Sequence, residues 1–167
     1  MFMMKIFGFA GYSGSGKTTL IEQLVPQFVM HGLKVSLIKH AHHDFDIDRP
    51  GKDSYRHREA GCSEVLITSS QRWVLMHELR GELEQSLRHQ LNRLAPCDLV
   101  LIEGFKKEPI PKMEIHRAAM GQPLLYPDDP YIIAIASDKQ IEARVPLLDL
   151  NDSQQISDFI LRHLQLK

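Results

Sequence analysis

The stretch GYSGSGKTT at residues 11–19 constrains the fold more than any other part of the chain. It fits the phosphate-binding pattern G-x-x-x-x-G-K-S/T at every fixed position. The short apolar run MKIFGFA at residues 4–10 precedes it, and a helical pattern of apolar residues follows it up to Gly32. A buried strand, a glycine loop and a helix in this order predict a P-loop nucleotide-binding core.

The residue types in this loop suit a nucleotide triphosphate. Glycines allow backbone N–H groups to turn toward phosphate oxygens, and the following helix adds the positive end of its dipole. We expect Lys17 to reach the β and γ phosphates and the Thr18 hydroxyl to join the shell of Mg²⁺. The alternative, a glycine-rich turn without a ligand, is disfavoured by the matching strand and helix. The predicted nucleotide contacts are Gly11, Tyr12, Ser13, Gly14, Ser15, Gly16, Lys17, Thr18 and Thr19.

Strands alternate with helices along the rest of the chain, which predicts an α/β fold of the P-loop NTPase type, with three layers and a mostly parallel sheet. Further strands are expected at residues 35–38, 64–68, 73–77, 98–102, 112–116 and 131–136. Helices are expected at residues 52–60, from Leu79 through Leu94, and in the tail after a cap at Asp152 or Ser153. Pro26 should kink or break the first helix.

One domain spanning residues 1–167 accounts for this pattern. Five of the nine prolines fall at residues 105–130, so we predict a proline-rich insertion there, carrying a short strand or hairpin. Leu124, Leu125 and Tyr126 within it are candidates for packing against a partner subunit.

Composition excludes several classes of protein. Twenty basic residues against twenty-one acidic ones give a net charge of −1, which argues against coating nucleic acid or an anionic membrane. Cys62 and Cys97 lie outside any metal-binding spacing and are expected to be free thiols in a reducing compartment. No apolar run approaches the roughly 18 residues of a membrane span. We therefore expect a cytoplasmic protein.

Two acidic residues are candidate partners of the metal. Glu103 follows the apolar run LVLI, so it should lie at a strand end facing the phosphates. Asp44 lies in the polar segment 39–48 and could bind Mg²⁺ through water or position the attacking water, although a plain surface turn is an equal alternative. We predict Lys17, Asp44 and Glu103 as catalytic residues, and Thr18, Asp44 and Glu103 as the metal neighbourhood.

The same polar segment contains His40, His42 and His43, which could instead form a transition-metal site. They lack the i, i+4 spacing of a helical ligand pair, so a polar loop beside the nucleotide is the preferred interpretation.

Asp138, after the apolar run YIIAIAS, could accept hydrogen bonds from two guanine N–H groups. The usual Asn-Lys-x-Asp arrangement is absent, and a turn or cap aspartate is the alternative. The basic residues Lys106, Lys107, Lys112 and Arg117 form either a solvated loop or a binding edge for a second anionic ligand, such as a phosphorylated metabolite.

Four segments in combination resemble the molybdopterin-guanine dinucleotide biosynthesis adapter proteins (the MobB family): GYSGSGKTTL, SLIKHAHHDFDIDRPGKDSYRHREAG, LVLIEGFKKEPIPKMEI and AIASD. The resemblance covers nearly the whole chain. It implies a small homodimeric P-loop protein that binds GTP with Mg²⁺ and hydrolyses it slowly. It further implies assistance to the guanylyltransferase that joins GMP to molybdopterin, with molybdopterin itself as a candidate ligand. It implies phosphate contacts from Gly11 to Thr18, a metal neighbourhood of Asp44 and Glu103, and a base contact from Asp138.

Three functions compete at this point. The first is a GTP-binding adapter with weak GTPase activity, in which no internal arginine finger is evident and Arg49 and Arg56 are the nearest candidates in sequence. The second is a small-metabolite kinase, which commonly needs an arginine-bearing lid, whereas residues 105–130 are proline-rich. The third is a scaffold that has kept the loop without using a nucleotide.

Overall fold

The computed structural model describes residues 4–41 and 45–166. These fall into two compact units, one made of the chain up to His40 and from Leu87 onward, the other of Ala41–Ser86. The expectation of one nucleotide-binding domain over residues 1–167 stays a prediction.

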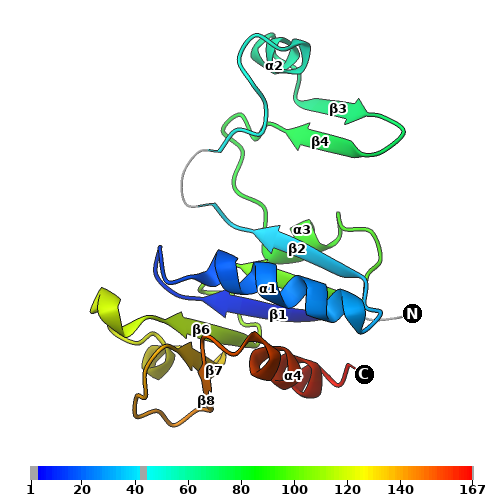
Figure 1. Ribbon diagram of the computed structural model, residues 1–167. Coiled ribbons are helices and arrows are strands. Elements are labelled where there is room, and N and C mark those ends of the chain that lie inside the picture. Colours follow the sequence, from blue (N-terminus) through cyan, green and yellow to red (C-terminus); the bar gives the residue numbers. More distant parts are fainter. Residues whose placement is uncertain (1–3, 42–44, 167) are drawn as a thin grey trace. The chain divides into compact units, whose positions relative to one another are not determined.

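The first unit is built on a six-stranded sheet in the order β2-β5-β1-β6-β7-β8, in which all neighbouring strands are parallel (Figure 1). Its strands are β1 (Lys5–Ala10), β2 (Val35–Lys39), β5 (Leu99–Glu103), β6 (Lys112–His116), β7 (Ile132–Ser137) and β8 (Leu147–Asp149). The central strand β1 leads into the glycine loop. The carboxyl ends of its neighbours lie at the same edge, where open parallel sheets bind ligands.

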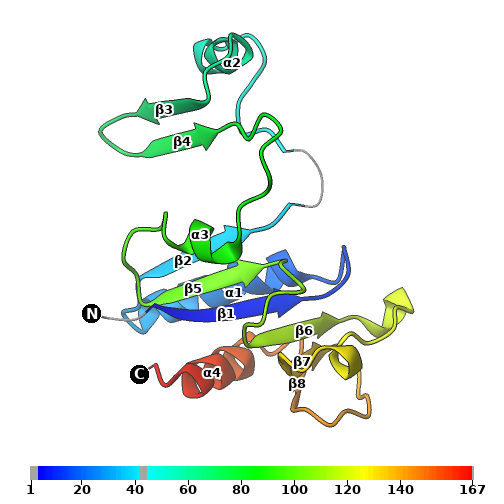
Figure 2. The same ribbon diagram turned by 180° about the vertical axis from the view of Figure 1, so that it is seen from behind.

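Helices cover both faces of this sheet, which gives three layers. The helices α1 (Lys17–Met30) and α4 (Ser153–Leu164) pack together on one face, over a core that includes Phe7 and Phe9 of β1. The short helix α3 (Leu87–Leu91) packs on the other face against residues of β5, as the reverse view shows (Figure 2). Two 3₁₀ turns, η1 (Ala118–Met120) and η2 (Tyr126–Asp128), follow β6.

The second unit consists of the helix α2 (Asp53–Glu59) and an antiparallel hairpin of β3 (Glu64–Thr68) and β4 (Trp73–His77). Leu66 pairs with Leu75, and Thr68 pairs with Trp73, so these side chains share one face of the hairpin. Leu66, Trp73 and Leu75 are all exposed. The hairpin therefore presents an apolar face to solvent.

The predicted α/β fold with a mostly parallel sheet is confirmed, and most predicted elements are present. The helix expected from Leu79 through Leu94 is wrong in its first half, because only Leu87–Leu91 is helical. Arg80 and Gly81 have φ angles of 46° and 92°, which a right-handed helix excludes. The strand β8 was not predicted. The helix α1 passes through Pro26 as a single element.

The proline-rich segment carries the predicted strand, and this strand β6 lies between β1 and β7 rather than at the surface. Buried Glu114 of β6 accepts hydrogen bonds from the backbone N–H groups of Leu125 and Tyr126, at 2.8 and 2.9 Å. These bonds tie the segment after β6 back to the sheet. Leu125 and Tyr126 are half-buried as a result, so the segment offers less apolar surface to a partner than the sequence suggested.

None of the helices formed by residues 4–41 and 45–166 has the length and apolar character needed to cross a bilayer.

Candidate functional site

The glycine loop connects β1 to α1 at the carboxyl edge of the sheet. Gly11 has a φ of 147°, and a Cβ there would lie 2.6 Å from the Ile115 carbonyl oxygen and 2.7 Å from the Ser15 hydroxyl. Gly16, the residue before the helix, adopts a left-handed φ of 99°. These positions need glycine for space and for backbone conformation, respectively. The loop thus reaches the helix N-terminus in the compact form that phosphate binding requires.

The Lys17 ammonium folds over this loop. Its Nζ donates to the carbonyl oxygens of Gly11, at 3.0 Å, and Tyr12, at 2.8 Å. Burial holds the pKa of Lys17 below its ordinary value, with Lys106 and Lys39 adding to this shift and Glu103 opposing it. The Lys17 ammonium is therefore held at the glycine loop. A phosphate bound there would favour the protonated form of Lys17, because a nearby negative charge stabilises the ammonium.

Thr18 and Glu103 meet beside the start of α1. The Thr18 hydroxyl donates to Oε1 of Glu103 at 2.7 Å, and Glu103 is only 7 % exposed at the end of β5. The ammonium of Lys39, at the end of β2, lies 3.5 Å from that same oxygen and 3.5 Å from the Thr18 oxygen. A hydroxyl and a carboxylate are the hard oxygen ligands that Mg²⁺ prefers, and a cation already stands beside them. The donor set fits a magnesium ion.

Asp138, the predicted base contact, lies just after β7 and is engaged with the segment after β6. Its Oδ1 accepts from the backbone N–H of Ala118 at 2.9 Å, and its Oδ2 lies 4.0 Å from Arg117 Nη1. Arg117 Nε in turn donates to the Ser15 carbonyl oxygen at 3.2 Å. Asp138 is thus connected through Arg117 to the glycine loop, and its role toward a guanine base stays a prediction.

The four basic residues of the proline-rich region divide into separate environments. Lys112 is buried and donates to the carbonyl oxygens of Lys106 and Glu108 and to Asp129, so it organises its own loop. Lys106 Nζ stands over the Tyr12 ring, 5.2 Å from its centroid. Lys107 is exposed. Lys112 is therefore wrong as a cation for a second anionic ligand, because it is buried and its ammonium is bound within the fold.

Asp44, His42 and His43 lie outside the described residues, so their predicted roles stay predictions. Within residues 4–41 and 45–166, no group of three or more His, Cys, Asp or Glu side chains is arranged to hold a metal ion. Arg49 and Arg56, the sequence neighbours considered as arginine fingers, belong to the second unit and are exposed.

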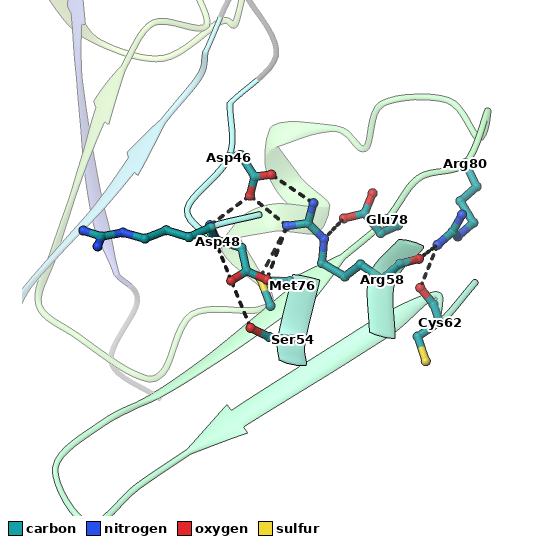
Figure 3. Close-up of polar contacts among 9 residues, drawn as sticks. Asp46, Asp48, Ser54, Arg58, Cys62, Met76, Glu78 and Arg80 are labelled. Carbon is teal, nitrogen blue, oxygen red and sulfur yellow. Dashed lines mark hydrogen bonds and ion pairs between the residues drawn. The ribbon is translucent and has the colours of Figure 1, made fainter. Parts of the chain in front are cut away.

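An ion-pair network holds the second unit together (Figure 3). Arg58 of α2 donates to both carboxylate oxygens of Asp46, at 2.8 and 3.1 Å, and its Nε lies 2.9 Å from Glu78. This pairing raises the pKa of Arg58 and lowers the pKa of Asp46 from their ordinary values. Arg80 adds hydrogen bonds to the carbonyl oxygens of Arg58 and Cys62. The network links the segment after residue 45 to α2 and to the end of β4.

Sequence reasoning did not single out Lys39 or the link from Arg117 to the glycine loop. Lys39 could have been found from the strand order. It ends β2, which is adjacent to β5, so it must lie near Glu103 at the end of β5. The link from Arg117 depends on the turn after β6, whose geometry has no local sequence signal.

Comparison with known proteins places these observations in a family. Residues 6–138 match the model of the family described as molybdopterin guanine dinucleotide synthesis protein B, MobB. The chain is 46% identical over 156 residues to the molybdopterin-guanine dinucleotide biosynthesis adapter protein of Haemophilus influenzae, covering 93% of this chain and 86% of the relative. It is 42% identical over 166 residues to the protein of the same name from Escherichia coli, covering 98% and 95% of the two chains.

Solved structures agree with this similarity. The fold resembles a crystal structure of molybdopterin-guanine biosynthesis protein B with a TM-score of 0.76 at 25% identity, covering 95% of this chain and 99% of the other. It also resembles the crystal structure of MobB from Bacillus subtilis with a TM-score of 0.75 at 27% identity, covering 96% and 98% of the two chains.

Proposed function

The chain belongs to the MobB family of molybdopterin guanine dinucleotide biosynthesis, and from this premise we propose that it is a GTP-binding adapter protein with weak, Mg²⁺-dependent GTPase activity. In this proposal it assists the guanylyltransferase that attaches GMP to molybdopterin. The observation that carries the nucleotide part is the convergence of Lys17, Thr18 and Glu103 at the end of β1.

The chemistry follows from these groups. Backbone N–H groups of the glycine loop and the Lys17 ammonium balance the charge of the β and γ phosphates. Thr18 and Glu103 would hold Mg²⁺, which when bound neutralises phosphate oxygens. Water attacks the γ phosphorus as the bond to the bridging oxygen breaks, giving GDP and phosphate. Arg117 lies beside the glycine loop, with its Nη2 3.1 Å from the position that a Cβ on Gly16 would take. Its Nε is occupied by the Ser15 carbonyl oxygen, which favours slow hydrolysis over efficient turnover.

A homodimer is also part of the proposal. The hairpin face formed by Leu66, Trp73 and Leu75 is apolar and exposed, and an isolated two-stranded hairpin is only marginally stable in water. A second copy of the chain would cover this face with an identical one, as a two-fold axis allows. Sedimentation of the purified protein tests this, since the mass of a single chain at micromolar concentration would exclude the dimer.

The adapter role is tested by adding nucleotide to the purified protein together with a guanylyltransferase–molybdopterin complex. We expect GTP with Mg²⁺ to change the affinity between the two proteins at least about fivefold, a coupling of about 1 kcal/mol, whereas ATP should not. Light scattering or surface-immobilised binding measures the association. If GTP leaves the affinity unchanged, a nucleotide-controlled adapter is untenable.

The same titration tests Asp138. With Asp138→Ala we expect the preference for GTP over ATP to fall, because the variant lacks a carboxylate for the two guanine N–H groups. Asp138→Asn is the matched control, since it retains the acceptor for the Ala118 N–H while changing the base-facing charge. An unchanged preference in both variants would limit Asp138 to supporting the turn after β6.

A further inference from the structure

Lys39 is the last residue of β2, and the sheet register places it directly beside Glu103 of β5. Its ammonium lies 3.5 Å from Glu103 Oε1 and 3.5 Å from Thr18 Oγ1. These two oxygens are themselves only 2.7 Å apart. One ammonium group therefore stands against both of the oxygen atoms assigned above to the magnesium ion.

We propose that Lys39 is the resident cation of the metal site: its ammonium neutralises Glu103 in the metal-free protein and must leave the two oxygens before Mg²⁺ can bind them. This inference rests on the proposed nucleotide site and adds a regulatory element to it. Metal binding becomes an exchange of one cation for another.

The need for a resident cation follows from burial. Glu103 is 7 % exposed, and a buried carboxylate is strongly unfavourable without a compensating charge. The other lysine at the loop, Lys17, directs its ammonium to the carbonyl oxygens of Gly11 and Tyr12. Lys39 supplies the ion pair that the structure shows on Oε1 of Glu103.

The two cations exclude each other at this position. Magnesium binds oxygen ligands at about 2.0–2.1 Å and draws on the same lone pairs that face the ammonium. A doubly charged ion on these oxygens would lie within a few ångströms of Lys39, where like charges repel strongly.

The Lys39 ammonium can move away from the two oxygens because its side chain is exposed and flexible. That side chain is 54 % exposed, and its ammonium lies at the end of a flexible four-carbon stem. Lys112 is a useful contrast, since its side chain is 2 % exposed and its ammonium has three acceptors. A lysine of the second kind is a fixed structural element, whereas Lys39 is exchangeable.

The test is a titration of Mn²⁺, a paramagnetic substitute for Mg²⁺, into the full-length protein with GDP. Electron paramagnetic resonance measures the concentration of free Mn²⁺ at each step. Lys39→Met removes the charge while keeping most of the stem. We expect Mn²⁺ to bind about fivefold to tenfold tighter to this variant than to the wild type, as expected for removal of one nearby, partly exposed charge. Lys39→Arg retains the charge and should bind Mn²⁺ within about twofold of the wild type.

Lys106→Met is the matched control, because Lys106 also lowers the pKa of Lys17 but stands over Tyr12 instead of on the Glu103 oxygen. Because its ammonium lies over the Tyr12 ring and not on the two oxygens, its removal should leave the Mn²⁺ affinity within about twofold of the wild type. Unchanged or weaker Mn²⁺ binding in Lys39→Met overturns the proposal. An equal gain in Lys106→Met also overturns it, since a general reduction of positive charge would then explain the effect.

Calorimetry with GDP and Mg²⁺ separates this inference from the proposed function. Absence of GDP binding by the wild type would contradict the proposed nucleotide site. The same Mn²⁺ titration on the protein without added nucleotide would then decide the exchange, because Thr18, Lys39 and Glu103 contact one another directly and the same gain is expected in Lys39→Met.

Discussion

Lys17→Ala is expected to weaken GTP binding at least about a hundredfold. The Lys17 ammonium donates to two carbonyl oxygens of the glycine loop, so it is placed where phosphates would bind. Charge-assisted hydrogen bonds contribute about 1.5–3 kcal/mol each. Losing two such bonds to the phosphates costs about 3 kcal/mol at the lower end of this range, which corresponds to at least about a hundredfold in dissociation constant. Isothermal titration with GTP and Mg²⁺ measures the change.

Lys5→Ala is a suitable control for this experiment. Lys5 is the first residue of β1, whereas the glycine loop follows the last residue of that strand. Both variants therefore lose one positive charge, but only Lys17→Ala loses it at the glycine loop. The control should bind GTP within about twofold of the wild type, because Lys5 lies at the opposite end of the six-residue strand from the glycine loop and charges more than a Debye length apart are largely screened. Equal affinity in Lys17→Ala and the wild type would remove the phosphate role of Lys17 and favour the scaffold that does not use a nucleotide.

The association assay gives Lys17→Ala a second readout. If nucleotide controls the adapter, the variant should associate with the guanylyltransferase complex to the same extent with and without GTP. If GTP still changes the association of a variant that no longer binds GTP, then GTP must act by binding to the guanylyltransferase complex.

The sequence was sufficient for the architecture of the first unit because its information is local. The glycine loop, the apolar strand before it and the helix after it specify one another through spacing alone, and the run LVLI before Glu103 identifies a buried strand with an acid at its end. The structure brings that acid to Thr18, as strand order in a parallel sheet requires.

The sequence was insufficient where contacts depend on distant segments. The leucines from Leu79 onward have helical spacing, but Arg80 and Gly81 turn the chain there, and Leu83 remains 91 % exposed. Lys112 looked like a surface cation in a basic run, whereas pairing of β6 with β1 and β7 buries it beneath its own loop. Neither burial nor backbone reversal is encoded in residue type alone.

Arg117 and Asp138 illustrate the same limit within the candidate site. Each was considered separately, as a cation for a second ligand and as a base contact. The structure places them 4.0 Å apart, with Arg117 against Ser15 of the glycine loop. A change at one residue should therefore affect the other, which is why Asp138→Ala is compared with Asp138→Asn.

Gly11→Ala should destabilise the first unit more than any other single methyl group added to the glycine loop. The new Cβ would lie 2.6 Å from the Ile115 carbonyl oxygen, a backbone atom of the neighbouring strand β6. Overpacking of this kind costs about 1–3 kcal/mol, and the φ of 147° adds about 1 kcal/mol of backbone strain for a residue with a side chain. We expect the free energy of unfolding to fall by about 2–4 kcal/mol and Tm by about 5–15 °C.

Gly14→Ala is the matched control, because Gly14 also has a positive φ, of 81°, but its nearest neighbour would be the flexible end of Met120 at 3.7 Å. Gly14→Ala has the conformational strain without the steric clash, so its free energy of unfolding should fall by only about 1 kcal/mol. Unfolding should be followed by calorimetry or far-ultraviolet circular dichroism without nucleotide, since the single tryptophan, Trp73, belongs to the second unit and its fluorescence reports on that unit. Equal losses in the two variants would show that backbone conformation, and not the approach of β6 to the loop, makes glycine necessary at residue 11.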